Sequence, residues 1–169
     1  MNKPLIVISS RTGNTRTVGH AICDDLPGAV MVEPDKLPED LSDYNPVLLG
    51  FWCDKWDAPE DIKAAAAKLH GKRIGCFATM GADPSEARAQ QWMKETSEKL
   101  VASGEGNELV ETFLCQGRIC REVYERMTAL LGQTTPEREK RMKESETHPD
   151  RLDLSKAAEI FRSAFGMNF

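Results

Sequence analysis

Five short apolar runs, separated by stretches with helical signals, constrain the fold of this chain more than any other feature of its sequence. The runs cover residues 5–8, 29–32, 47–51, 74–78 and 109–115. Strands that alternate with helices are typical of a parallel sheet covered by helices on both faces. We therefore predict an α/β fold in which each run forms one strand.

The composition of these runs predicts the order of the strands. The first, third and fourth runs are almost entirely apolar, as expected for central strands that are buried on both faces. The second run is short, and the fifth carries Glu111 and Thr112, so both are expected at the edges. This pattern matches a doubly wound five-stranded sheet of order 2-1-3-4-5. A length of 169 residues fits a single domain over residues 1–169.

Two motifs predict helix starts, because each places an acid at an N-cap and a glutamate three residues later. They run from Asp57 to Glu60 and from Asp83 to Glu86. A final helix is expected near residues 153–165. The mixed-charge segment before it, within residues 132–150, predicts an exposed helix with loops. The helix after Asp83 should bury one stripe, formed by Ala89, Trp92, Met93, Thr96 and Leu100.

Charge and cysteine content exclude several classes of function. The net charge of −5 argues against nucleic acid as the main partner, because phosphate backbones require a basic face. No apolar stretch approaches the roughly 20 residues of a membrane span, and the short N-terminal run does not resemble a signal peptide. The five cysteines include no C-x-x-C pair, and the three histidines show no metal spacing. We therefore expect free thiols, no metal and a cytoplasmic location.

The most specific motif follows the first strand directly and opens a helix. Backbone N–H groups at a helix start favour an anion, and a glycine lets a ligand approach the backbone closely. Hydroxyl groups can donate further hydrogen bonds to a phosphate. The expected phosphate-binding residues are Ser9, Ser10, Arg11, Thr12, Gly13, Asn14 and Thr15.

The stretch from Ser10 to Thr15 resembles the FMN-phosphate loop of flavodoxins, written [ST]-x-T-G-N-T. This resemblance implies FMN as the cofactor and a flavin ring held between the loops that follow strands 3 and 4. In the first of these loops, Trp52 and Trp56 are candidates to stack on the ring, with Trp56 favoured because it lies mid-loop. The candidate residues of the second loop are Thr79, Met80, Gly81 and Asp83.

The sequence departs from the commonest flavodoxin pattern at two positions. No glycine occurs between Phe51 and Pro59, and Met80 stands where an aromatic residue is usual. The sequence at residues 50–52, 77–83, 115–117 and 148–150 resembles a flavodoxin subgroup that includes BilS-type proteins, which are associated with bilirubin reduction in gut bacteria.

The resemblance implies an electron carrier that docks on a redox partner protein, either a reductase or an acceptor. One alternative is an FMN-dependent oxidoreductase that acts directly on a small molecule. A second alternative comes from the spacing of Cys115 and Arg121, which matches the C-x5-R signature of cysteine-dependent phosphatases. Against it, that loop follows strand 1 in similar phosphatases, and Glu122 would repel a phosphate.

Overall fold

The computed structural model describes residues 2–166. Its five strands form one parallel sheet of order β2-β1-β3-β4-β5, which confirms the predicted fold class, the strand order and both edge strands. The strands are β1 (Lys3–Ile8), β2 (Val30–Val32), β3 (Tyr44–Trp52), β4 (Arg73–Met80) and β5 (Glu108–Gln116). The helices are α1 (Asn14–Asp25), α2 (Glu60–Ala66), α3 (Ala87–Ala102), α4 (Arg121–Leu131), α5 (Pro136–Ser145) and α6 (Arg151–Ala164), with a 3-10 turn η1 (Pro34–Lys36).

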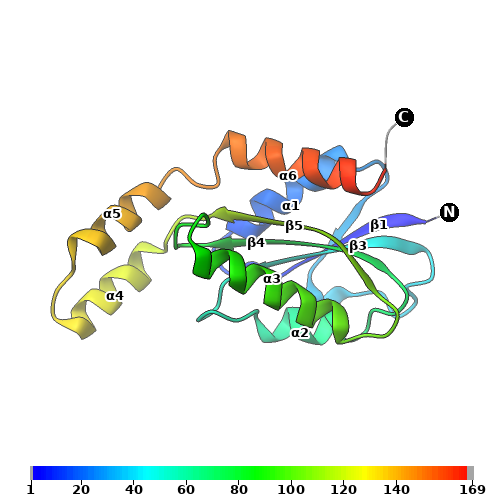
Figure 1. Cartoon of the computed structure of the whole chain (residues 1–169), viewed down its shortest axis with the longest axis horizontal. Helices are drawn as coiled ribbons and strands as arrows, with labels where there is room; N and C mark the ends of the chain where they lie inside the picture. Colours follow the sequence, from blue (N-terminus) through cyan, green and yellow to red (C-terminus); the bar gives the residue numbers. More distant parts are fainter. Residues whose placement is uncertain (1, 167–169) are drawn as a thin grey trace.

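Helices cover both faces of the sheet and enclose one apolar cluster on each (Figure 1). Helices α2 and α3 pack on one face, and α1 and α6 pack on the other. Successive residues of a strand point to opposite faces, so Leu5 and Val7 enter the first cluster while Ile6 and Ile8 enter the second. The predicted stripe of α3 is buried as expected. No helix within residues 2–166 is long and apolar enough to cross a membrane.

Both predicted capping boxes, one before α2 and one before α3, are wrong. The carboxylates of Asp57 and Asp83 accept hydrogen bonds within turns and do not cap a helix. Asp57 accepts hydrogen bonds from its neighbour Ala58 (2.8 Å) and from the Lys63 amine (2.6 Å), and α2 begins only at Glu60. Asp83 accepts from the backbone N–H and the hydroxyl of Ser85, at 2.9 and 2.7 Å. Helix α3 therefore begins after this turn, at Ala87.

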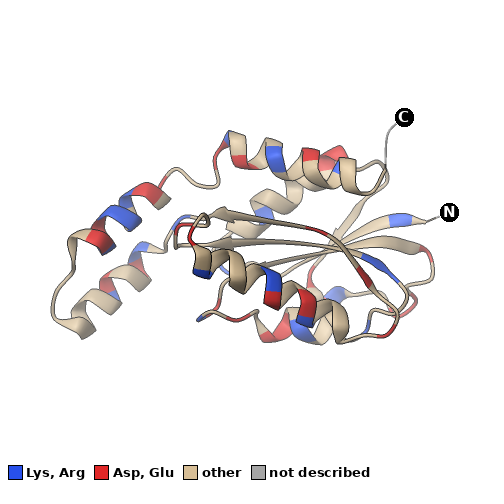
Figure 2. Ribbon diagram, viewed as in Figure 1, with Lys and Arg blue, Asp and Glu red and all other residues tan. Residues whose placement is uncertain are grey.

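The chain between β5 and α6 folds as two helices, α4 directly after the end of β5 and α5 within residues 132–150. These helices form a hairpin that extends away from the sheet, at the edge where the strands end (Figure 1). Both helices carry basic and acidic residues, which in α4 are confined to its first half (Figure 2). Helix α5 confirms the exposed helix that was expected within residues 132–150.

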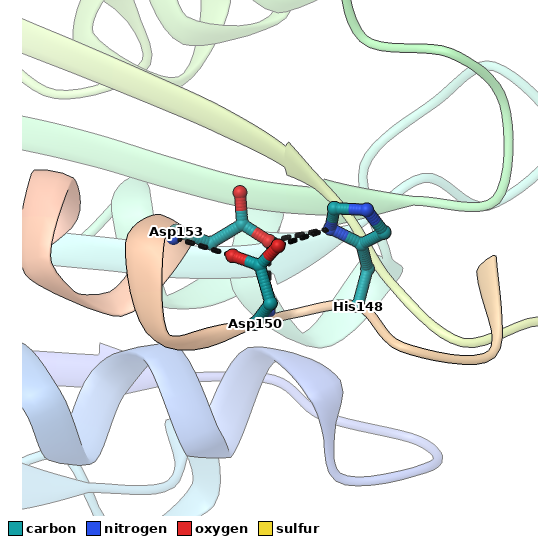
Figure 3. A group of neighbouring side chains, drawn as sticks. All are labelled: His148, Asp150 and Asp153. Atoms are coloured by element: carbon teal, nitrogen blue, oxygen red, sulfur yellow. Dashed lines mark hydrogen bonds and ion pairs between the residues drawn. The ribbon is translucent and has the colours of Figure 1, made fainter. Parts of the chain in front are cut away.

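Helix α6 begins at Arg151, two residues before the predicted start, because Asp150 caps it. The Asp150 carboxylate accepts from the Asp153 N–H at 2.9 Å, and the Asp153 carboxylate accepts from the Asp150 N–H at 2.8 Å. The ring nitrogen Nδ1 of His148 lies 2.6 Å from the same Asp153 carboxylate (Figure 3). This arrangement fixes where the chain leaves the hairpin and returns to the sheet.

Candidate functional site

A cleft opens at the edge of the sheet where the parallel strands end, the usual ligand position in such folds. Four segments meet there, namely the loop after β1, the end of β3, the end of β4 and the segment from β5 into α4. The cleft is lined by Ser10, Arg11, Thr12, Asn14, Thr15, Trp52, Cys53, Thr79, Met80, Gly81, Gly117, Arg118, Ile119, Cys120 and Val123. The lining contains two arginines and no carboxylate.

The loop after β1 has the geometry of an anion cradle. Gly13 adopts a left-handed conformation with φ of 97°, which a residue with a side chain rarely adopts. The Ser10 hydroxyl accepts hydrogen bonds from the backbone N–H groups of Gly13 (3.2 Å) and Arg16 (3.3 Å) and so holds the loop in shape. Helix α1 then starts at Asn14, where the first N–H groups have no partner within the helix. These N–H groups and the helix dipole favour a bound anion.

Two contacts join this loop to the rest of the cleft. The hydroxyl oxygens of Thr15 and Thr79 lie 3.0 Å apart, both buried. The Asn14 amide donates to the carbonyl oxygen of Arg118 at 2.9 Å. Asn14 can approach so closely because Gly117 lacks a side chain, since a Cβ there would lie 2.7 Å from the amide nitrogen. The loops after β1 and β5 are therefore held together by direct contacts.

Four of the predicted site residues lie outside the lining of this cleft, namely Ser9, Gly13, Asp83 and Trp56, the last of which is described below. Ser9 is buried, and its hydroxyl donates to both carboxylate oxygens of Asp61 on α2, at 2.8 and 3.0 Å. The alternation of side chains along a strand explains why Ser9 points toward α2. Ser9 directly follows β1 and still continues its pleat. Asp83 belongs to the turn before α3. Gly13 shapes the loop through its backbone but lines a neighbouring hollow.

The structure separates the two candidate tryptophans. Trp52, the last residue of β3, lines the cleft, and the Arg11 guanidinium carbon lies 5.7 Å from the centre of its ring. Trp56 packs against the apolar cluster under α2 and α3, with the Arg88 guanidinium carbon 3.9 Å from its ring centre. The geometry therefore brings Trp52 to the cleft, whereas the sequence favoured Trp56.

A tight turn determines the direction of Trp56. Asp54 and Asp57 exchange two backbone hydrogen bonds of 2.9 Å each, around Lys55 and Trp56. Both central residues have positive φ values, 51° and 61°, which defines a type I′ turn. Such turns favour Asn-Gly, because ordinary side chains are strained in this conformation. The turn places Trp56 against the core and away from the cleft.

Sequence reasoning missed one wall of the cleft, which is built by the segment from Gly117 to Val123. The Ile119 side chain packs so closely on Gly81 that a Cβ there would lie 2.8 Å from it. Cys53, next to Trp52, was also missed, and burial raises the pKa of its thiol. The sequence did contain a signal for this wall. In a parallel sheet the loop after β5 begins at the same edge as the loops after β3 and β4.

The geometry contradicts the phosphatase alternative. Cys115 is 3% exposed, lies in the apolar cluster under α1 and α6, and does not line the cleft. Burial raises the pKa of its thiol well above the ordinary value, so the nucleophilic thiolate is disfavoured. The Arg121 guanidinium instead pairs with the carboxylate of Glu146, the residue after α5, at 3.2 Å.

Comparisons with known proteins agree with this architecture. The chain is 28% identical over 166 residues to the flavodoxin-like domain-containing protein BilS of Clostridioides difficile, covering 92% of both chains. Oxidised flavodoxin 1 from Bacillus cereus superposes with a TM-score of 0.61 at 17% identity, covering 99% of both chains. A flavoprotein from Lactobacillus acidophilus, solved in complex with FMN, superposes with a TM-score of 0.52 at 14% identity, covering 68% of this chain and 93% of its own.

The solved structures are below 25% identity and show the fold, which is that of flavodoxins. FMN is the cofactor found in such a relative. The sequence pattern of the flavodoxin domain family matches residues 5–162, nearly the whole chain. This protein therefore belongs to the flavodoxin domain family.

Proposed function

We propose that this protein binds FMN in the cleft and carries electrons to a redox partner protein, as one domain over residues 1–169. The observation that carries the proposal is the cradle after β1, where free N–H groups of α1 and several hydroxyls converge beside two arginines and no carboxylate. This donor set fits a phosphate monoester. The five thiols are all free, which supports a reducing compartment such as the cytoplasm.

The phosphate group would be held by the backbone N–H groups of Asn14 and Thr15 and by the hydroxyls of Thr12 and Thr15. A hydrogen bond to a charged acceptor contributes roughly 1.5–3 kcal/mol, so several of them hold a phosphate without a lysine. Arg11 and Arg118 add positive charge at the rim. Each of these groups donates hydrogen bonds, as a dianionic ligand requires.

The isoalloxazine ring would lie between Trp52 on one side and the Ile119 and Val123 side chains on the other. Met80 completes the apolar surface at the end of β4. FMN, when bound, supplies one- or two-electron redox chemistry, while the protein positions the ring and limits its contact with water. The excess negative charge of the chain suits a basic partner surface.

The cofactor is tested by titrating the apo-protein with FMN and with riboflavin while flavin fluorescence is followed. We expect FMN to bind at least about a hundredfold more tightly, because riboflavin lacks the phosphate. Thr12→Ala should reduce this preference. The matched control is Thr17→Ala, because the Thr17 hydroxyl donates to the Gly13 carbonyl at 2.9 Å, on the outer side of the helix start. Equal affinity for the two flavins would contradict the proposal.

The carrier role needs a separate test with the FMN-loaded protein. After photoreduction, the protein should reduce cytochrome c, a basic haem protein, in a stopped-flow experiment. The rate should fall as salt is added, because opposite charges steer the encounter. Tight FMN binding without electron transfer to the protein acceptor, together with rapid turnover of a small-molecule acceptor, would favour a direct oxidoreductase instead.

A further inference from the structure

Arg11 contacts the side of the cleft where the flavin ring would lie, which separates its role from that of the phosphate cradle. Its guanidinium carbon is 5.7 Å from the centre of the Trp52 ring, and both residues line the cleft. Trp52 ends β3, whereas the cradle is formed by the loop after β1 and the start of α1. FMN whose ring lies against Trp52 therefore has the Arg11 guanidinium next to that ring.

The positive charge of Arg11 is not neutralised by a neighbouring acid. Among the residues that the structure describes, no ion pair involves Arg11. The lining of the cleft contains no carboxylate either. The full charge of the guanidinium is thus available to a ligand in the cleft.

The aspartates in the two loops beside the ring do not offset this charge. Asp57 pairs with the Lys63 amine at 2.6 Å, and Asp83 accepts hydrogen bonds in the turn before α3. Asp54 follows Cys53 directly but does not line the cleft. The cleft is therefore positively charged, although the whole chain carries −5.

This charge distinguishes between the two redox states of a bound flavin. The ring of oxidised FMN is neutral, whereas uptake of two electrons and one proton from a reductant leaves it with one negative charge, and the phosphate stays the same. Resting on the proposed FMN site, we propose that Arg11 stabilises the negative charge of the reduced ring. Because binding and reduction are linked, the preference for reduced FMN makes the bound flavin easier to reduce. A weaker reductant can then load the protein with electrons.

Arg118, the second arginine of the lining, is held in a different way. Its guanidinium donates to the carbonyl oxygen of Glu146 through Nε at 3.1 Å and through Nη2 at 3.0 Å. These two bonds tie it to the residue that follows α5. Arg118 therefore offers a matched comparison, with the same charge at the same cleft but without the contact to Trp52.

Titration of the apo-protein with oxidised FMN and, without oxygen, with dithionite-reduced FMN at pH 8 tests the proposal, followed by tryptophan fluorescence. Arg11→Gln should weaken reduced FMN about threefold to thirtyfold more than oxidised FMN, as two unit charges several ångströms apart near a protein surface predict. Arg11→Lys keeps the charge and should retain most of the preference. Arg118→Gln should weaken both forms by the same factor.

A second measurement checks the same effect without a titration. The midpoint potential of bound FMN, measured against a reference dye, should fall in Arg11→Gln and stay close to the wild-type value in Arg11→Lys. Added salt should reduce the difference between Arg11→Gln and the wild type, because Arg11 is exposed and its charge is screened.

The possible failures of this inference and of the proposed function are distinct. Equal weakening of both redox forms in Arg11→Gln would overturn the inference and assign Arg11 to the phosphate. The same selective loss in Arg118→Gln would also overturn it, because the effect would then come from charge at the rim in general and not from the position over Trp52. A wild type that binds neither form of FMN would overturn the proposed function, and the inference with it.

Discussion

The hydroxyl of Thr15, in the first turn of α1, lies 3.0 Å from the hydroxyl of Thr79, at the end of β4. Their residues are only 1% and 2% exposed, so this contact is shielded from water. It joins the loop after β1 to the end of β4, and both residues line the cleft. This buried pair therefore helps to hold the two sides of the cleft in position.

Replacing Thr79 by valine should lower the free energy of unfolding of the apo-protein by about 1–3 kcal/mol. The shape of the side chain is kept, but the buried Thr15 hydroxyl loses its partner. Urea unfolding measures the effect, and FMN titration should show weaker binding. The control is Thr112→Val on β5, where the side chain is only half-buried. Equal stability of the Thr79→Val variant and the wild type would show that the pair does not stabilise the site.

Trp52→Ala should weaken FMN binding by several-fold to about a hundredfold, because an aromatic contact contributes roughly 0.5–1.5 kcal/mol beyond the apolar area it buries. Trp56→Ala should leave FMN affinity nearly unchanged but lower the melting temperature of the apo-protein, since Trp56 packs on the core and on Arg88. Fluorescence titration and thermal unfolding of both variants distinguish the two roles. The reverse pattern would place the ring over Trp56.

Lys55→Asn should raise the free energy of unfolding by about 0.5–1 kcal/mol. Lys55 has a φ of 51° in the type I′ turn, and asparagine tolerates this left-handed conformation better than lysine does. Lys55→Ala is the control, because it removes the same amine without favouring the turn, and it should not stabilise the protein. Equal gains from both variants would assign the effect to charge and not to backbone conformation.

The thiol of Cys115 should resist alkylation in the folded protein at pH 8. Burial raises its pKa, so the neutral thiol predominates until the pH rises far above the ordinary range, and access is also blocked. Mass spectrometry after iodoacetamide treatment should find half-exposed Cys120 modified first. Hydrolysis of p-nitrophenyl phosphate by the wild type, lost in Cys115→Ser, would revive the phosphatase alternative.

The cap of α6 should depend on pH in a defined direction. The N–H of Asp153, with His148 nearby, holds the pKa of Asp150 below its usual value. A lowered pKa means that the cap stabilises the fold above the unfolded-state pKa of about 3.9 and is lost as the pH falls through the lower folded-state value. Asp150→Ala should therefore reduce the melting temperature at pH 7, and the difference from the wild type should shrink in acid. Asp150→Asn, which keeps an acceptor oxygen, should lose less at pH 7.

Much of this protein could be predicted from its sequence because the relevant interactions are local. Strand burial follows from the apolar runs, and edge position follows from polar residues such as Glu111 in β5. The cradle after β1 consists of consecutive residues, so the order strand, glycine loop and helix is enough to predict an anion site. The flavodoxin family and its cofactor could be inferred from that short segment.

Contacts between distant residues decided the rest. Asn14 binds the Arg118 carbonyl across 104 positions of sequence, and this contact helps to make the segment after β5 a wall of the cleft. Trp56 lies outside the cleft because of a strained turn that no local preference predicts, since Lys55 and Trp56 both disfavour it. The sequence alone thus determined the strand order and the order of strand, glycine loop and helix after β1, because burial pattern and backbone preference are encoded residue by residue. Only the tertiary structure decided which side chains line the cleft, because side-chain direction at a loop depends on partners that the chain brings together by folding.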